Sequence, residues 1–150
     1  SRGLGDVYKR QVKEFAGKKI IMGATTGDII SRELNLKVED VFRFEDPELP
    51  PLNYMEGIDL FTEGILTLNK VEKLLIAYNI NLKLNRGPAD EIVKLILESD
   101  EIDFIIGTRI NIAHQDPHLP VELEIRRTVV NRIARLLEEK LLKKVKVSFV

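Results

Sequence analysis

The feature that most constrains the fold is a short apolar run that ends in a glycine turn. Residues 58–61 (IDLF) have the pattern of a buried strand, and Thr62-Glu63-Gly64 follows them directly. Glycine permits the sharp turn that carries the chain into the next helix. The carboxylate of Glu63 then stands at a rigid strand end, where acidic ligands for hard cations are usually displayed. A single carboxylate cannot hold such a cation, so its partners must come from elsewhere in the chain.

Strand patterns and helix patterns alternate along the chain. Apolar residues at helical spacing predict helices over residues 29–34, 66–78, 88–98 and 121–141. Short apolar or alternating runs predict strands over residues 18–23, 38–44, 58–61, 100–110 and 145–149. The prolines of residues 44–54 and 114–120 predict two loops. This order predicts one domain of the α/β (α+β) class, with sheet strands alternating with helices.

Composition narrows the classes of partner. The 150 residues carry a net charge of -1 and a pI near 6.2, which gives no sign of a nucleic-acid or membrane-surface binder. The lack of cysteine excludes disulfides, thiolate metal sites and cysteine nucleophiles. Nothing in the sequence resembles a signal peptide or a membrane span, so we expect a cytoplasmic protein.

The first 11 residues, SRGLGDVYKRQ, differ in character from the rest. They contain few apolar residues and resemble a translated adapter remnant that recurs at the ends of proteins from metagenomic assemblies. We therefore expect residues 1–11 to be a non-native or disordered tail, the alternative being a frayed natural terminus. We expect the domain to occupy residues 12–150 and the natural protein to begin upstream of Val12.

Two further acidic residues stand at the start of the strand predicted near residue 101. Glu101 and Asp103 are two positions apart, so in an extended chain both carboxylates point to the same face. With Glu63 they could form part of an all-oxygen site of the kind that suits magnesium or manganese rather than zinc. The alternative is that Glu101 and Asp103 are only the polar entrance to a strand, and their spacing alone favours that alternative.

The loop after this strand holds two more candidates. His114 lies in a proline-bounded loop, where functional residues concentrate. Arg109 has a planar guanidinium that could meet a phosphate. We treat Arg109 and His114 as candidate substrate or leaving-group residues. The alternative, that His114 only orders a long loop through hydrogen bonds, stays open.

Three segments together resemble the C-terminal part of PPM-type serine/threonine phosphatases, in the branch of the sporulation stage II protein E. They are residues 22–26 (MGATT), 59–68 (DLFTEGILTL) and 101–120. The resemblance covers roughly residues 12–150. The complete phosphatase domain is an α-β-β-α sandwich, and its upstream half, with the first acidic strand and the aspartate-glycine turn, has no counterpart after Val12. The resemblance therefore implies a partial α-β-β-α sandwich.

The resemblance also implies a function. The family hydrolyses phosphoserine and phosphothreonine in proteins, using two divalent cations, Mn²⁺ or Mg²⁺, that activate a bridging water. Metal binding maps onto Glu63 and Glu101, each in place of a family aspartate, with Asp103 as a supporting or alternative ligand. We expect the parent protein to be a metal-dependent phosphatase acting on a phosphoprotein. We expect this chain alone to be inactive and to expose apolar surface that favours self-association.

Two other interpretations stay open. The first is a regulatory domain on a degenerate phosphatase fold that binds a partner without catalysis, and the glutamates in place of family aspartates favour it. The second is a generic α/β ligand-binding domain, which rests only on the alternation of strands and helices.

Overall fold

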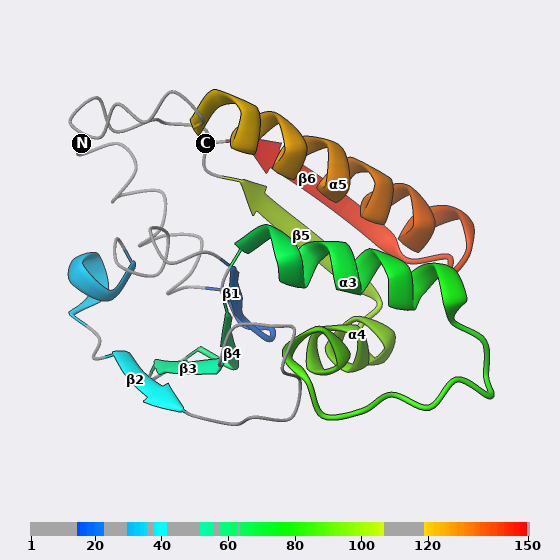
Figure 1. Cartoon of the computed structure of the whole chain (residues 1–150), viewed down its shortest axis with the longest axis horizontal. Coiled ribbons are helices and arrows are strands. Elements are labelled where there is room, and N and C mark those ends of the chain that lie inside the picture. The colour runs from blue at the N-terminus through cyan, green and yellow to red at the C-terminus, as the bar shows by residue number, and fades with distance from the viewer. Residues whose placement is uncertain are drawn as a thin grey trace.

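The structure is a computed structural model, in which helices and strands are mixed along the chain (Figure 1). This mixture confirms the predicted α/β (α+β) class, while the sandwich arrangement stays a prediction. The tail predicted at residues 1–11 lies outside the described residues. The structure describes residues 15–22, 30–35, 38–41, 52–55, 58–62, 64–106 and 119–149.

The first sheet is four-stranded and contains β1 (Ile20–Met22), β2 (Val38–Val41), β3 (Leu52–Met55) and β4 (Leu60–Thr62). Its spatial order is β1-β4-β3-β2. β1 and β4 run parallel, whereas β3 is antiparallel to both β4 and β2. Met22 lies opposite Thr62, so the parallel strands β1 and β4 end side by side.

The second sheet is a parallel pair, β5 (Glu101–Ile106) and β6 (Lys144–Phe149). The side chains of Ile102, Phe104 and Ile106 on β5 belong to the apolar core or pack against it. Successive side chains of a strand point to opposite faces, so Glu101 and Asp103 belong to the outer face of this sheet. Both acidic residues are exposed.

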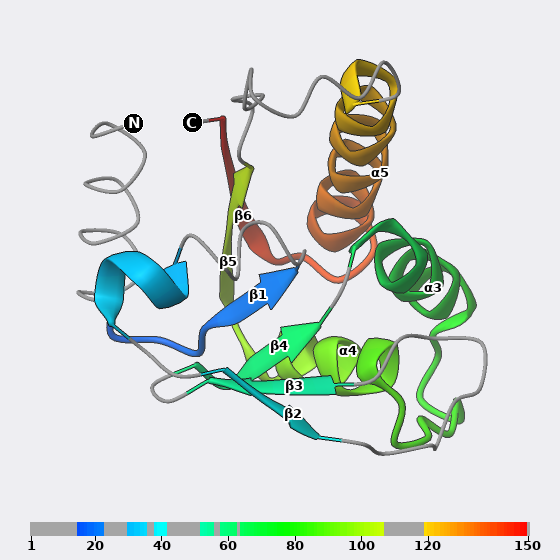
Figure 2. The same ribbon diagram turned by 60° about the vertical axis from the view of Figure 1, so that its left-hand side comes forward.

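Three long helices pack beside the second sheet, and α5 is the one that lies against it. They are α3 (Gly64–Ala77), α4 (Pro88–Glu98) and α5 (Leu119–Glu139). Helix α3 contacts α4 and α5, and α5 lies along β6 in both views (Figures 1 and 2). Their facing apolar stripes form the core, whose fully buried members include Leu75, Val93, Ile133 and Leu137. Gly64 has a φ of 24°, which explains why glycine stands at the turn into α3.

The helices α3 and α5 run side by side in the same direction and are joined by polar contacts. The guanidinium of Arg132 donates through Nε and Nη2 to the carboxylate of Glu72, at 2.7 and 3.1 Å. This hydrogen bond and the charge of Glu72 raise the pKa of Arg132. Near the end of α3, the Lys140 ammonium donates to the carbonyl oxygens of Leu75 and Ile76, at 2.9 and 2.7 Å.

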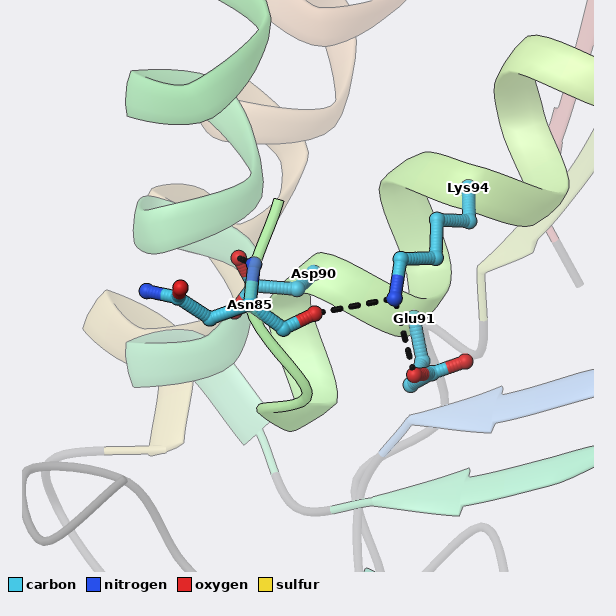
Figure 3. A network of polar contacts seen from close by, with 4 residues as sticks. All are labelled: Asn85, Asp90, Glu91 and Lys94. Carbon is cyan, nitrogen blue, oxygen red and sulfur yellow. Dashed lines mark hydrogen bonds and ion pairs between the residues drawn. The ribbon is translucent and has the colours of Figure 1, made fainter. Parts of the chain in front are cut away.

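The start of α4 is held by a small polar network (Figure 3). Pro88 occupies the first helical turn, as the sequence predicts, and Gly87 caps the helix without a side-chain hydrogen bond. The carboxylate of Asp90, which is 3% exposed, accepts the backbone N–H of Asn85 at 3.0 Å. The Lys94 ammonium donates to the carbonyl oxygen of Asn85 at 2.9 Å and to Glu91 at 3.3 Å. The preceding loop is therefore tied to the helix through both backbone groups of Asn85.

Several sequence predictions require correction. Leu52–Met55 forms β3, although residues 44–54 were predicted to be a loop, because pairing with β2 and β4 holds the segment extended. Helices α3 and α5 begin at Gly64 and Leu119, each two residues before its predicted start. Residues 104–107 have the apolar pattern of a buried strand, but of those that the structure describes only Ile106 is buried, and the outer face of β5 carries Glu101 and Asp103. Residues 38–44 alternate only weakly, which suggests an edge strand, and β2 does lie at one edge of the described four-stranded sheet.

Surface features bear on two further expectations. Of the helices that the structure describes, none combines the length and the apolarity needed to cross a membrane. Large apolar side chains are exposed on α3 and α5, in the segments that follow these two helices, before β1 and on β6, but self-association stays a prediction. The exposed residues are Phe15, Leu66, Ile76, Ile80, Val121, Ile125, Leu142 and Phe149.

Candidate functional site

A cavity of about 310 Å³ lies between β1 and β5, and we call it the β1–β5 cavity. Every residue of the stretches 17–22 and 101–106 lines it. A strand that showed a face to the cavity would contribute alternate residues, because successive side chains point to opposite faces. The unbroken runs therefore mean that the edges of β1 and β5 border the cavity. In the described part of the chain, β1 pairs only with β4 and β5 only with β6, so neither bordering edge has a strand partner there.

The walls between these two edges are mostly apolar. Helix α4 contributes the largest share, and α3, α5 and the helical residues 30–34 add one apolar side chain each. The hydroxyl of Ser99, also in the wall, donates to the carbonyl oxygen of Leu95 at 2.7 Å. The apolar side chains from the helices are Ile30, Leu68, Ile92, Leu95, Ile96 and Val130.

The segment just before β1 contains charged residues, and hydrogen bonds join it to the segment just before β4. The Asp59 carboxylate accepts the backbone N–H of Lys19 at 2.7 Å, and the backbone N–H of Asp59 donates to the carbonyl oxygen of Lys19 at 2.9 Å. The same carboxylate lies 3.5 Å from the Lys18 ammonium. Both lysines line the β1–β5 cavity. Asp59 thus holds the start of the parallel β1–β4 pair and places two cationic residues beside the cavity.

Two of the predicted metal ligands, Glu101 and Asp103, also line the cavity, at the edge of β5. The carboxylate of Glu101 lies 3.5 Å from the Lys144 ammonium, its register partner on β6. Asp103 stands opposite Lys146 in the same register. The alternating acids of β5 and the alternating lysines of β6 therefore form a cross-strand charge ladder on the outer face. This arrangement matches the alternative interpretation, in which the two acids are the polar face of a strand.

The remaining predicted site residues, Glu63, Arg109 and His114, lie outside the described residues, and so do Thr25 and Thr26. β4, which Glu63 follows in sequence, and β5, which begins with Glu101, belong to different sheets. Among the residues that the structure describes, no three acidic or histidine side chains are grouped as a metal site would require. The shared metal site of Glu63 and Glu101 therefore stays a prediction.

Arg126, which is not among the site residues predicted from the sequence, lines the β1–β5 cavity from α5. Its signal in the sequence is positional. Leu123, Arg126 and Val130 follow one another at spacings of three and four, the pattern of a buried helical stripe. An arginine at a position where the pattern predicts an apolar residue could have been singled out from the sequence.

Comparisons with known proteins found no relative of this chain. No family model, no curated protein and no solved structure matches this chain. The functional interpretation therefore depends on the residues of the chain and on the geometry described above.

Proposed function

We propose that this chain is a regulatory α/β domain that binds a small ligand in the β1–β5 cavity. The observation that carries the proposal is the position of the cavity, between the edges of two strand pairs that belong to different sheets. Small-molecule sites in proteins are commonly concave, largely apolar and supplied with a few polar groups that orient the ligand. The cavity has apolar side chains from helices and backbone N–H and C=O groups along its two strand edges.

The size of the cavity supports a small ligand. At about 310 Å³ it lies near the lower end of the range of roughly 300–1,000 Å³ that is typical of ligand pockets. A ligand in it would contact β1 and β5 at once. Because the two strands belong to separate sheets, such a ligand would favour one placement of the sheets over others. This coupling is how binding here would regulate the rest of a larger protein.

The proposal is tested by titrating the protein with a neutral apolar probe, 1-octanol, and recording amide resonances by NMR. We expect saturable shifts confined to β1, β5 and the cavity side of α4. The substitution Leu95→Trp adds bulk to the cavity wall and should abolish the saturable shifts. Leu97→Trp is the matched control, because Leu97 is a half-buried residue of the same helix that does not line the cavity.

Both variants are first checked for folding by circular dichroism. Shifts that map away from β1 and β5 would contradict the proposal, and so would unaltered binding in folded Leu95→Trp. If neither the wild type nor the control shows saturable binding of the probe, the cavity is not a ligand site and the proposal fails.

A second candidate, metal-dependent hydrolysis of phosphoserine or phosphothreonine by the parent protein, rests on the resemblance to PPM-type phosphatases. One observation favours it: β1 and β4 end in register at Met22 and Thr62, and Glu63 follows Thr62 directly in sequence. A carboxylate in that position would follow a strand end that is fixed by pairing. Arg109 and His114 remain its candidate substrate residues.

The described residues near Glu101 do not fit a divalent cation well. Lys144 lies beside Glu101, and Lys146 is the register partner of Asp103, so two positive charges accompany the two acids. Their repulsion would oppose binding of Mn²⁺ or Mg²⁺ on that face. We therefore derive no catalytic step for a metal at Glu101 and Asp103.

Turnover of a phosphopeptide in the presence of millimolar manganese separates the two candidates. We expect no turnover by this chain alone, and turnover once the upstream half of the phosphatase domain is supplied. In that longer protein Glu63→Ala should abolish activity, while Glu91→Ala, a change in an acid that lies on α4, should not. Robust turnover by the isolated chain, or full activity of Glu63→Ala, would contradict this second candidate.

A further inference from the structure

Arg126 occupies a position on α5 that the helical pattern reserves for apolar residues. The inward stripe of α5 is formed by residues at alternating spacings of three and four, and three of its members, Val130, Ile133 and Leu137, are buried. Arg126 is half-buried on the same stripe and lines the β1–β5 cavity next to Val130. The stripe is Leu123, Arg126, Val130, Ile133 and Leu137.

The guanidinium of Arg126 has no hydrogen-bond or ion-pair partner among the described residues, in contrast to other cations on the same helix. Arg132 makes a bidentate pair with Glu72, and Arg127 stacks over the ring of Phe149 at 4.8 Å from its centroid. A charged group that is partly withdrawn from water is unfavourable unless it is paired. An anion bound in the cavity would supply the partner that the described residues do not provide.

The acids of β5 do not supply that partner. Glu101 and Asp103 belong to the outer face of the second sheet, where Lys144 and Lys146 are their register partners. Helix α5 packs against the opposite face, on which Ile102 and Phe104 reach the core. The two acids border the cavity at the strand edge, but they belong to the face opposite the one that α5 covers, and each has a lysine of β6 as register partner that offsets its negative charge.

We infer that Arg126 binds the carboxylate of a small amphiphilic acid whose apolar part fills the β1–β5 cavity. This inference rests on the proposed function, because it requires the cavity to take a ligand. The planar fork of an arginine matches the two oxygens of a carboxylate, and paired hydrogen bonds of this kind orient the bound group. The small cavity volume of about 310 Å³ and its apolar walls select a compact, unbranched or singly branched acid over a larger ligand.

A purely structural role for Arg126 is the competing explanation. In that role the aliphatic part of the side chain covers the cavity wall while the guanidinium reaches water. Substitution by methionine separates the two roles, because methionine retains an unbranched apolar side chain and removes the charge. Arg135→Met is the matched control: Arg135 lies on the same helix, is exposed and does not line the cavity.

The test compares the affinities of octanoate and 1-octanol, which share a chain length and differ in charge, by NMR titration at constant ionic strength. In the wild type and in Arg135→Met we expect octanoate to bind about tenfold or more tightly than 1-octanol, the factor that one charge-assisted pair supplies. In Arg126→Met we expect this preference to vanish while 1-octanol binding stays within about twofold of the wild type, since the packing is kept.

The outcomes separate the role of Arg126 from ligand binding by the cavity as a whole. Binding of 1-octanol without a preference for octanoate would overturn the role of Arg126 and leave the proposed function intact. A preference for octanoate that survives Arg126→Met would likewise overturn it. Failure of 1-octanol to bind in the wild type would overturn both the proposed function and the inference.

Discussion

Removing the carboxylate of Asp90 should destabilise the fold more than removing the carboxylate of its neighbour Glu91 in the first turn of α4. Asp90 is 3% exposed, accepts the backbone N–H of Asn85 at 3.0 Å and stands near the positive end of the helix (Figure 3). A hydrogen bond to a charged group contributes about 1.5–3 kcal/mol, and a negative charge at a helix N-terminus about 0.3–1 kcal/mol. Asn85 is exposed, so water can reach its N–H after the change. Because water can then satisfy this N–H, no unpaired buried donor adds to the cost, and we expect Asp90→Ala to lower the free energy of unfolding by about 2–3 kcal/mol.

Two other variants serve as controls for Asp90→Ala. Asp90→Asn keeps an oxygen that can accept the same hydrogen bond and removes only the charge, so its loss should be about 1 kcal/mol. Glu91→Ala removes a neighbouring acid whose described contact is the Lys94 ammonium at 3.3 Å. That pair is partly exposed, and pairs of this kind contribute about 0–1 kcal/mol.

Free energies of unfolding measured by urea denaturation, followed by circular dichroism, check the ranking. A domain of this kind has a total stability of about 5–15 kcal/mol, so a loss of about 2–3 kcal/mol moves the midpoint clearly. The reasoning would be refuted if Asp90→Ala lay within about 0.5 kcal/mol of the wild type, or if Glu91→Ala were equally damaging.

Two further predictions concern the helix pair α3 and α5. Leu75 is 0% exposed, and Leu75→Ala should lower the free energy of unfolding, measured in urea, by about 2–5 kcal/mol. Its neighbour Ile76 is 59% exposed, and Ile76→Ala should lower it by less than about 0.5 kcal/mol. Equal losses would contradict the assigned inward face of α3. Arg132→Gln should destabilise the protein by a margin that is constant between pH 7 and pH 10. The hydrogen bond to Glu72 and the negative charge of Glu72 raise the pKa of Arg132, so its contribution is fully present below the unfolded-state pKa of arginine and is lost only as the pH rises through the folded-state pKa. A margin that shrinks over this range in urea unfolding would show that the pairing with Glu72 is not its source.

The sequence alone predicted the elements whose pattern is local. Apolar residues at helical spacing located α3, α4 and α5 to within two residues, and they identified Val71, Leu75, Ile92 and Ile133 as inward-facing. Alternation located β6, and the glycine after Thr62 marked the turn into α3, where Gly64 has a positive φ. These features depend on neighbours a few positions apart, so the periods of 3.6 and 2 residues reveal them.

The candidate site was harder to predict from the sequence, because strand pairing brings together residues that are far apart in the chain. Residues 52–54 follow two prolines and were predicted to be part of a loop, yet pairing with β2 and β4 makes them part of β3. The sequence alone suggests that Glu101 and Asp103 are metal ligands. The parallel register of β5 and β6 places Lys144 and Lys146 opposite them, which does not favour a cation there. Spacing within one strand cannot indicate which side chains the neighbouring strand supplies.

The cavity was decided by tertiary structure alone. Its borders are the edges of β1 and β5, about eighty positions apart in the chain, and its walls come from residues of every described long helix. One residue of the sequence does indicate the cavity, namely the arginine on the apolar stripe of α5. A charged residue among core positions needs a polar partner or access to a cavity. Local periodicity determines which residues turn inward. Only the packing of distant elements decides whether they meet one another or leave a space between them, and here it leaves Arg126 facing that space.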